Sequence, residues 1–281
     1  MTELSLAAID RIDNLPTLPQ VVVEVNRLMQ DPDVSLQQVG ELIEKDLALA
    51  PRILKLVNSS FFGLSTRISS ISRAVVLLGF NTVRSALFSV AVIDAMASGR
   101  DDGLFNIQSF WKHSLTVAVI SRYISQQTGL ADKENAFTAG LLHDIGKIVL
   151  WQHFNPWFKA IHEKAVREGL PLFRIEDQEG DFSHAAIGAH LAQKWQLPEV
   201  LCRAIRFHHR PTRDANAAPE GIIHVADILS HCVADNNNSY RLEEAAVDVN
   251  DPPWAVVKDV HQWYPAIADE IEEACQFFLK G

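Results

Sequence analysis

Two ionisable side chains that can bind metal ions stand next to each other in an otherwise apolar stretch, AGLLHDIGKIVLW, at residues 139–151. They are His143 and Asp144, and Lys147 follows one helical turn after the histidine. Burying such groups without partners is costly, so something must lie opposite them. Neighbours on a helix point about 100° apart, yet both can reach an ion over the helix face. Gly146 permits a close approach or a local turn there.

Further residues of the same two types follow this pattern along the chain. They are His113, His184, His208, His209 and Asp227. Two of their surroundings, FWKHSLTVAVISRYI and GIIHVADILSHC, are apolar helical stretches in which a polar side chain requires a partner. Ordinary roles remain open, because a lone buried histidine is often only hydrogen-bonded and a histidine near a helix C-terminus favours the helix dipole. His224 and His231 share a face with Asp227, as its partners or as alternative ligands.

A helical frame must position these residues. Apolar residues recur with helical spacing along the chain, and no convincing alternation predicts a strand, so we expect an all-α fold. Ser35 and Gln38 stand at capping-box spacing and mark the start of one N-terminal helix. Helices of the C-terminal part are expected near residues 108–128, 133–152, 156–168, 182–196, 199–209, 219–234 and 253–279.

A break with two glycines and a charge cluster, ASGRDDGLFN, lies at residues 97–106. All 11 histidines follow it, between residues 113 and 261. This distribution indicates that the two parts of the chain have different roles. The alternative is that the histidines are unevenly distributed by chance. We expect an N-terminal helical subdomain over residues 1–100, packed on a metal-binding helical subdomain with a C-terminal helix over residues 105–281. The N-terminal part is expected to provide packing and interaction surfaces and no metal ligands.

Composition limits the classes of partner. The chain has 281 residues, of which 48% are apolar and 21% charged, with a net charge of −10. This acidic balance argues against nucleic acid as a partner, although a small phosphorylated ligand remains compatible. Three cysteines without CxxC spacing are typical of reduced thiols in a cytoplasmic protein. The N-terminus lacks the pattern of a signal peptide, and no apolar run is long enough to span a membrane.

Three stretches of the chain resemble the HDOD domain family. They are LPTLPQVVVEVNRLMQDPDVSLQQVGELIEKDLALAPRILKLVNSSFFG, then ISSISRAVVLLGFNTVRSALFSVAVIDAM, then FWKHSLTVAVIS. The resemblance runs from about residue 12 to about residue 235. The pattern H…HD…D is also similar to the HD superfamily of metal-dependent phosphohydrolases, and the additional H…HH resembles its HD-GYP branch.

The resemblance implies a bacterial signal-transduction or scaffold module related to the HD hydrolases. It implies these metal ligands: His113, His143, Asp144, His184, His208, His209 and Asp227. Two features depart from the HD-GYP pattern. No Gly-Tyr-Pro signature follows the histidine pair, where RPTRDANAAPE stands instead, and no acidic residue precedes His113 at the position of the extra glutamate ligand. Specificity for cyclic di-GMP and a third ion are therefore not expected.

Five histidines and two aspartates exceed what one ion needs, so one or two ions are expected. Mixed imidazole and carboxylate donors suit Fe, Mn, Zn or Ni better than Mg or Ca. Asp144 is the candidate bridge between two ions, which together would activate water and hold phosphoryl oxygens. Lys147 is the candidate point charge that neutralises a phosphate. Asp144 and Lys147 are thus the candidate catalytic residues for hydrolysis of a phosphomonoester or phosphodiester.

We therefore expect a regulatory protein with a retained HD-type metal site, acting on a signalling protein partner or a small phosphorylated ligand. One alternative is a dedicated phosphodiesterase or phosphatase for a nucleotide or cyclic dinucleotide. Another is a non-catalytic module in which the metal only joins helices; the two differ in whether a coordination position is open. A DNA-binding role for residues 35–60 is a third alternative, and the acidic balance of the chain opposes it. No pattern indicates an oligomeric state.

Overall fold

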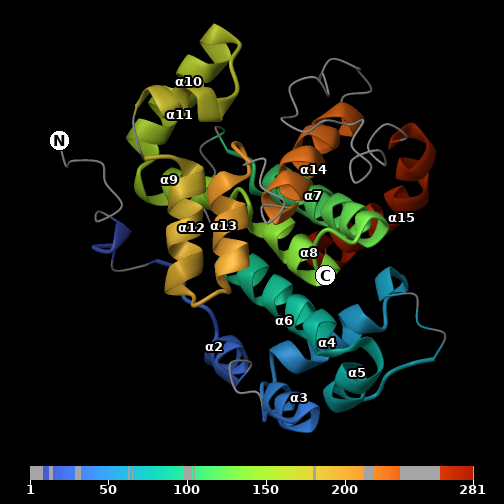
Figure 1. The fold of residues 1–281 in the computed structure, drawn as a ribbon. Coiled ribbons are helices and arrows are strands. Elements are labelled where there is room, and N and C mark those ends of the chain that lie inside the picture. Colours follow the sequence, from blue (N-terminus) through green and yellow to red (C-terminus); the bar gives the residue numbers. More distant parts are fainter. Residues whose placement is uncertain are drawn as a thin grey trace.

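The computed structural model describes residues 9–12, 15–28, 33–62, 64, 66–97, 103, 105–179, 182–211, 218–234 and 260–280. These residues form helices and their connections and no β-strand, which confirms the all-α class (Figure 1). The elements are α2 (Gln20–Leu28), α3 (Leu36–Glu44), α4 (Leu49–Val57), the 3-10 helix η1 (Ser60–Phe62), α5 (Ile71–Leu78), α6 (Phe80–Ala95), α7 (Ile107–Thr128), α8 (Lys133–Leu142), α9 (Ile145–His153), α10 (Asn155–Glu168), α11 (Leu172–Gln178), α12 (His184–Lys194), α13 (Glu199–Phe207), α14 (Ala218–Ala234) and α15 (Val260–Lys280).

Local sequence signals fix several helix ends. The capping box predicted from Ser35 and Gln38 is present at the start of α3, where the serine Oγ accepts from the backbone of Gln38 and the glutamine Oε1 accepts from the backbone of Ser35. Two orphan donors of the first turn are thereby satisfied. Gly129 and Gly169 end α7 and α10 in the left-handed conformation that glycine adopts without steric cost.

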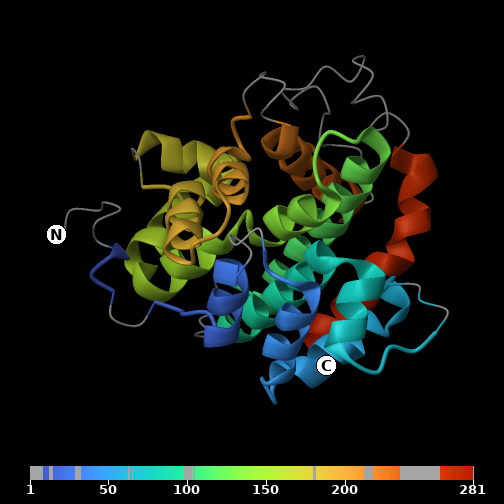
Figure 2. The ribbon, with the colours of Figure 1, turned by 60° about the horizontal axis from the view of Figure 1, so that its bottom comes forward.

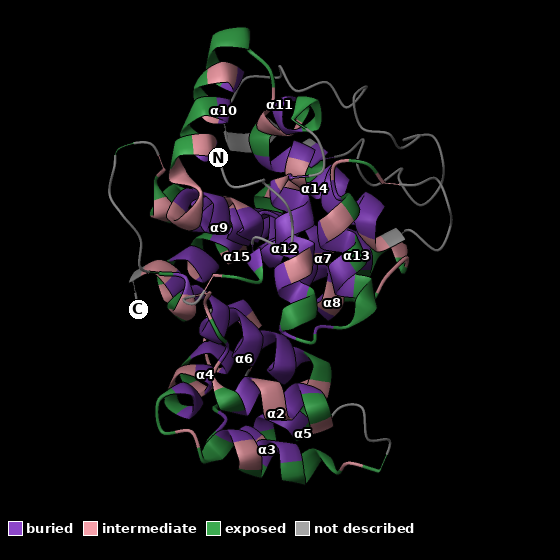
Figure 3. Ribbon diagram, turned by 90° about the vertical axis from the view of Figure 1, so that its left-hand side faces the viewer, coloured by how far each residue is buried: buried purple, intermediate pink, exposed green. Residues whose placement is uncertain are grey.

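The longest helix, α7, is the centre of the C-terminal part. Helices α8, α14 and α15 pack against it, and α12 packs against α9 and α13 (Figures 1 and 2). Tyr123 of α7 stacks on Trp263 of α15, with ring centroids 4.6 Å apart. Helix α10 lies at the end of the molecule away from α2–α5 and is exposed along one side, whereas α7 and α8 are buried along most of their length (Figure 3). The side chains of α7 and α8 therefore point mainly into the interior, toward the helices packed against them.

Helix α6 packs along α8 and joins the N-terminal helices to the C-terminal part, and η1 also contacts α15. Hydrogen bonds cross between α6 and α8. They run from Thr82 Oγ1 to Glu134 Oε1 at 3.2 Å, from Arg84 Nη2 to Asn135 Oδ1 at 2.7 Å, and between Ser85 Oγ and Thr138 Oγ1 at 3.0 Å. One apolar cluster continues from Ile9 to Phe278 and includes residues of both parts. The division into residues 1–100 and 105–281 stays a prediction.

Two differences from the predicted helices affect the site. The helix expected at 133–152 is two helices, α8 and α9, with His143 and Asp144 between them. Helix α11 was not predicted. The C-terminal helix begins at Val260 among the described residues, and residues 253–259 lie outside them. Among the described residues, none of the helices combines the length and the apolar character needed to cross a bilayer.

Candidate metal centre

At the break between α8 and α9, the side chains of His143 and Asp144 point toward one common site. His143 Nδ1 donates to the carbonyl oxygen of Gly140 at 2.7 Å, which uses an acceptor in the last turn of α8. Asp144 leaves the helical conformation, with φ −100° and ψ 4°, and its carbonyl then accepts from the backbone of Lys147 at 2.8 Å. The two side chains therefore converge at an interruption between helices, and His143 Nε2 lies 3.4 Å from Asp144 Oδ2. In an unbroken helix the two side chains would point about 100° apart.

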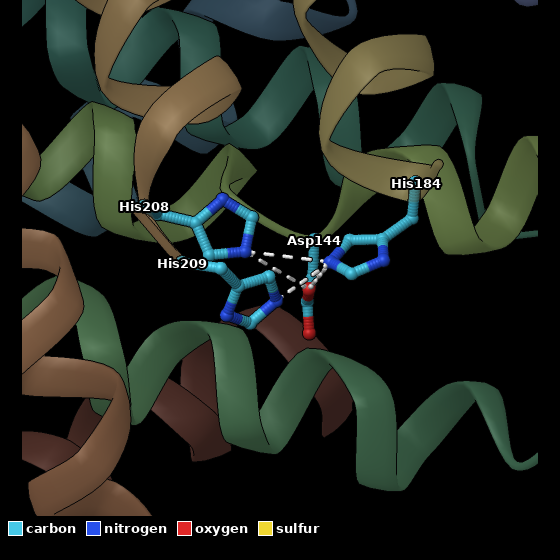
Figure 4. A group of neighbouring side chains, drawn as sticks. All are labelled: Asp144, His184, His208 and His209. Atoms are coloured by element: carbon cyan, nitrogen blue, oxygen red, sulfur yellow. Dashed lines mark hydrogen bonds and ion pairs between the residues drawn. The ribbon is translucent and has the colours of Figure 1, made fainter. Parts of the chain in front are cut away.

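Asp144 lies at the centre of the seven predicted residues, and its two oxygens face different neighbours. Its Oδ1 lies 3.2 Å from Nε2 of His184 and 3.7 Å from Nε2 of His208. His209 completes this cluster, with its Nε2 3.0 Å from that of His184 (Figure 4). We call Asp144 Oδ1 with these three histidines the first donor group. It assembles residues from the α8–α9 junction, the start of α12 and the end of α13.

The other oxygen of the same carboxylate faces a second set of donors. Asp144 Oδ2 lies 3.4 Å from Nε2 of His143 and 3.7 Å from Nε2 of His113. Asp227 Oδ1 lies 3.2 Å from Nε2 of His113 and 3.8 Å from Nε2 of His143. We call Asp144 Oδ2, His113, His143 and Asp227 the second donor group. His231 lies at its edge, with Nε2 3.6 Å from Asp227 Oδ1.

Hydrogen bonds at the far side of the rings fix which nitrogen faces the site. Nδ1 of His143 and of His208 each donates to a backbone carbonyl, of Gly140 and Ile205 respectively, at 2.7 Å. Ser230 uses its own proton on the carbonyl of Asp227, so its oxygen accepts from Nδ1 of His113 at 3.2 Å. In each neutral ring the unprotonated nitrogen is then Nε2, which is the ligand atom that a metal requires.

Three ring nitrogens of the first donor group lie close together. Nε2 of His184 lies 3.0 Å from Nε2 of His209 and 3.4 Å from Nε2 of His208. Two neutral acceptors cannot approach this closely without a proton or a cation between them. Nε2 of His143 is fully buried and has no hydrogen-bond partner, which is costly unless a ligand satisfies it. The donors therefore fit a bound transition-metal ion, and their mixture of imidazole and carboxylate suits Fe, Mn, Zn or Ni.

Glu176 of α11 is a buried site residue that the sequence analysis missed. Its Oε2 lies 2.5 Å from Nδ1 of His184, and its Oε1 accepts from the backbone N–H of the same residue at 3.1 Å. The side chain is completely buried. A carboxylate on the outer nitrogen of a ligand histidine fixes its tautomer and raises its basicity. No spacing rule joins residue 176 to the other members, because the contact depends on how α11 packs.

The electrostatics of the cluster distinguish its histidines. Burial lowers the pKa of His184, but the Glu176 carboxylate outweighs it and raises this pKa to about 9. Burial, reinforced by the neighbouring rings, holds the pKa values of His208 and His209 well below the ordinary 6.5. In the metal-free protein a proton on His184 therefore lies beside the neutral rings of His208 and His209. A metal ion would displace that proton, as metal binding generally does.

Lys147 lies beside the carboxylate that joins the two donor groups. Its Nζ donates to Asp144 Oδ2 at 2.5 Å. Burial alone raises the pKa of Asp144, yet the Lys147 ammonium and the His143 ring hold it well below its ordinary value. Burial lowers the pKa of Lys147, but Asp144 outweighs this and raises it. Both groups are therefore charged at neutral pH.

Gly146 allows two helices to approach closely at the site. A Cβ atom at this position would overlap the carbonyl oxygen of His184 and lie 2.8 Å from the amide nitrogen of Gly188. The first turn of α12 can contact α9 only because this atom is absent. The predicted close approach is thus confirmed, and it brings His184 within reach of Asp144.

A cleft of about 980 Å³ opens over both donor groups. The residues that line it include Lys147, His184, His209 and Asp227, together with residues 170–174. A cavity of this size accommodates a small organic ligand. A smaller neighbouring cavity of about 280 Å³ adjoins it and is lined in part by Phe173, Arg206 and Arg210.

The sequence also offers Arg206, Arg210 and Arg213 as positive charges near the metals, with Trp151 as an aromatic side chain within reach. Arg210 does line the cleft, and it pairs with Asp177 at 2.5 Å. Trp151 is instead buried, with its ring stacked on Phe105 at 5.0 Å, and it does not line the cleft. Arg213 lies outside the described residues.

Comparison with known proteins decides the family. The model of the HDOD domain matches residues 15–211, which is more than half of the chain. This protein belongs to the HDOD family. Among solved structures, an HDOD domain protein of Geobacter sulfurreducens is 28% identical, with a TM-score of 0.77 over 99% of each chain. A protein of Shewanella amazonensis SB2B, whose name assigns it provisionally to the phosphohydrolases, is 25% identical, with a TM-score of 0.73 over 97% of this chain and 98% of that one.

Two curated relatives are longer than this HDOD protein. An uncharacterised protein of Treponema pallidum (strain Nichols) is 33% identical over 212 residues, which are 74% of this chain and 40% of that protein. Ribonuclease Y of Lawsonia intracellularis is 30% identical over 136 residues, which are 48% of this chain and 20% of the enzyme. The chain thus matches less than half of the length of these relatives.

Proposed function

We propose that this HDOD protein is a regulatory protein that hydrolyses a small phosphoester with one or two transition-metal ions. The observation that carries the proposal is the arrangement around Asp144. Its two oxygens face two sets of donors, and members of both sets, His184, His209 and Asp227, line one cleft together with a charged lysine. A site that only joins helices would be closed by its own ligands, whereas a catalytic site keeps room for water and substrate. The metal ligands proposed are His113, His143, Asp144, His184, His208, His209 and Asp227.

The residues of the chain have separate roles in this proposal. Bound ions would lower the pKa of a water molecule and polarise the phosphoryl group. Asp144 contributes one oxygen to each donor group and so fixes the distance between them. The ammonium of Lys147 faces the cleft and neutralises negative charge on the phosphoryl oxygens as a point charge. Asp144 and Lys147 are thus the catalytic residues that we propose.

The walls of the cleft favour a small or generic phosphoester over cyclic di-GMP. Lys147, Arg174 and Arg210 supply positive charge around the opening. An aromatic platform for a base is less evident, because the Phe173 ring already stacks on His209 at 4.2 Å and lies beneath the Arg174 guanidinium. We therefore expect slow hydrolysis of simple phosphoesters and no efficient cleavage of cyclic di-GMP.

Two alternatives remain to be tested against this proposal. A dedicated phosphodiesterase for a nucleotide or cyclic dinucleotide would use the same donors with a fitted base site. The names of the ribonuclease Y relatives also raise RNA as a substrate, and the net charge of −10 opposes it.

The test is turnover of an aryl phosphate, cyclic di-GMP and a short RNA by protein loaded with Mn or Fe. We expect metal-dependent cleavage of the aryl phosphate alone, abolished in His143→Ala. This substitution removes one donor of the second donor group. Metal-loaded protein that cleaves none of the three would support a non-catalytic module. Fast cleavage of cyclic di-GMP that disappears in the variant would make the protein a dedicated phosphodiesterase.

A further inference from the structure

The histidines of the site are held in two different ways. His143 and His208 are anchored by carbonyl groups of their own helices, and His113 by Ser230 of α14. His184 has its outer nitrogen on Glu176 of α11, and the His209 ring stacks on Phe173 of the same helix. One short helix outside the ligand-bearing helices therefore contacts two ligands of the first donor group.

Glu176 fixes both the backbone and the ring of His184. One oxygen accepts from the backbone N–H at the first residue of α12, where a carboxylate also interacts favourably with the helix dipole. The other oxygen lies 2.5 Å from Nδ1 of the ring. Since Nδ1 then carries the proton of the neutral ring, Nε2 presents its lone pair to Asp144, 3.2 Å away.

Phe173 orients the second ligand by packing. Its ring lies 4.2 Å from the His209 ring at an interplanar angle of 16°, which is a stacked arrangement. Phe173 and Glu176 are three residues apart, so they project from the same side of α11. Asp177 adds an ion pair with Arg210, the residue after His209, at 2.5 Å. The helix thus fixes the ring and the following backbone of this ligand.

We propose that α11 is the positioning element of the first donor group, with Glu176 and Phe173 holding His184 and His209 for one ion. The second donor group holds its ion without α11. This inference rests on the proposed function, because it assumes that the two donor groups bind metal. A change in α11 should therefore weaken the binding of one ion and leave the other bound.

Glu176→Gln tests the role of the carboxylate with almost no change in shape. The amide oxygen must remain on the backbone N–H of His184, so the amide NH₂ group faces Nδ1 of the ring. The ring then accepts at Nδ1 and carries its proton on Nε2. That proton points at Asp144 and occupies the position of the ion. Glu179→Gln is the matched control, since Glu179 is an exposed carboxylate that contacts Lys164 at 3.5 Å.

The experiment is titration of the metal-free protein with Co²⁺, followed by calorimetry and by visible absorption. Wild-type protein and Glu179→Gln are expected to bind two ions. In Glu176→Gln one ion should bind 10- to 100-fold more weakly, the range found for partners of metal-ligating histidines, and the other should be unchanged. Phe173→Ala, which keeps every carboxylate, should weaken the same ion.

A double-mutant comparison identifies which ion is affected. His113→Ala removes a donor of the second group, so adding Glu176→Gln should abolish the remaining tight binding. His209→Ala already damages the first group, so adding Glu176→Gln should change the remaining ion little. Circular dichroism of the metal-free variants must match that of Glu179→Gln. If Glu176→Gln does not fold, Phe173→Ala carries the same prediction.

Equal weakening of both ions, or unchanged binding of both, would overturn the role of α11 and leave the proposed function standing. The same holds if the Glu176→Gln effect is as large in His209→Ala as in wild type. Absence of Co²⁺ binding by the wild-type protein would reject the proposed function, and this inference with it.

Discussion

Replacing Gly146 by alanine should separate α9 from α12 and damage the site. In an unobstructed helix interior this change stabilises a protein by about 1 kcal/mol. Here the new Cβ would overlap the His184 carbonyl oxygen and lie 2.8 Å from the Gly188 nitrogen, against 3.4 Å for an ordinary contact. Both neighbours are backbone atoms that cannot turn away. Overpacking of this kind costs about 3 kcal/mol, so the net loss of unfolding free energy should be about 2 kcal/mol.

Gly146→Ala should affect metal binding more strongly than it affects the stability of the fold. The first turn of α12 must move by more than about 0.5 Å, which is the tolerance of a working metal or catalytic site. His184 Nε2 then leaves its place 3.2 Å from Asp144 Oδ1. We expect Gly146→Ala to bind the ion of the first donor group at least about tenfold more weakly, a loss comparable to those of other supporting changes.

The assay combines urea unfolding of the metal-free protein with Co²⁺ titration. Gly40→Ala is the matched control, because its Cβ would lie 2.6 Å from Cα of Ser72, between α3 and α5 and away from the site. It should lose stability in the same way and retain both ions. The reasoning is refuted if Gly146→Ala is as stable as wild type and binds metal with unchanged affinity.

Two further predictions concern the charges of the site. In metal-free protein the raised pKa of His184, about 9 against 6.5, contributes about 3 kcal/mol of stability below pH 6.5 that is lost as pH rises through 9. The depressed pKa values of His208 and His209 have the opposite effect on stability. Below pH 6.5 these histidines gain protons in the unfolded chain and not in the folded one, so stability falls as the pH decreases. Urea midpoints should therefore be highest near pH 6.5. A midpoint that rises steadily to pH 9 would contradict this. Lys147→Met should keep its metal by elemental analysis and lose about 100-fold in kcat/KM for an aryl phosphate; unchanged kcat/KM would exclude its proposed role.

The parts of the fold that follow local rules could be predicted from the sequence. The start of α3 depends on two side chains three residues apart, and both are where the capping box requires them. The all-α class follows from apolar spacing that is repeated along the chain. The break at His143 and Asp144 was missed, because apolar residues continue at helical spacing on both sides of it.

The candidate site divides in the same way. The order of histidines and aspartates indicated a cluster, and the structure brings the other six residues around Asp144. Whether they bind metal stays a prediction. Glu176 and Phe173 could not be found from spacing, because each meets its histidine only through the packing of α11. Gly146 was recognised as a position of close approach, whereas its partner α12 could be named only from the structure.

The metal content of purified protein tests the central claim most directly. Protein produced in metal-replete medium and measured by elemental analysis should contain transition metal at one to two ions per chain. Asp144→Ala should remove most of it, because this carboxylate faces both donor groups. Absence of transition metal from the wild-type protein, or full metal content in Asp144→Ala, would contradict the account.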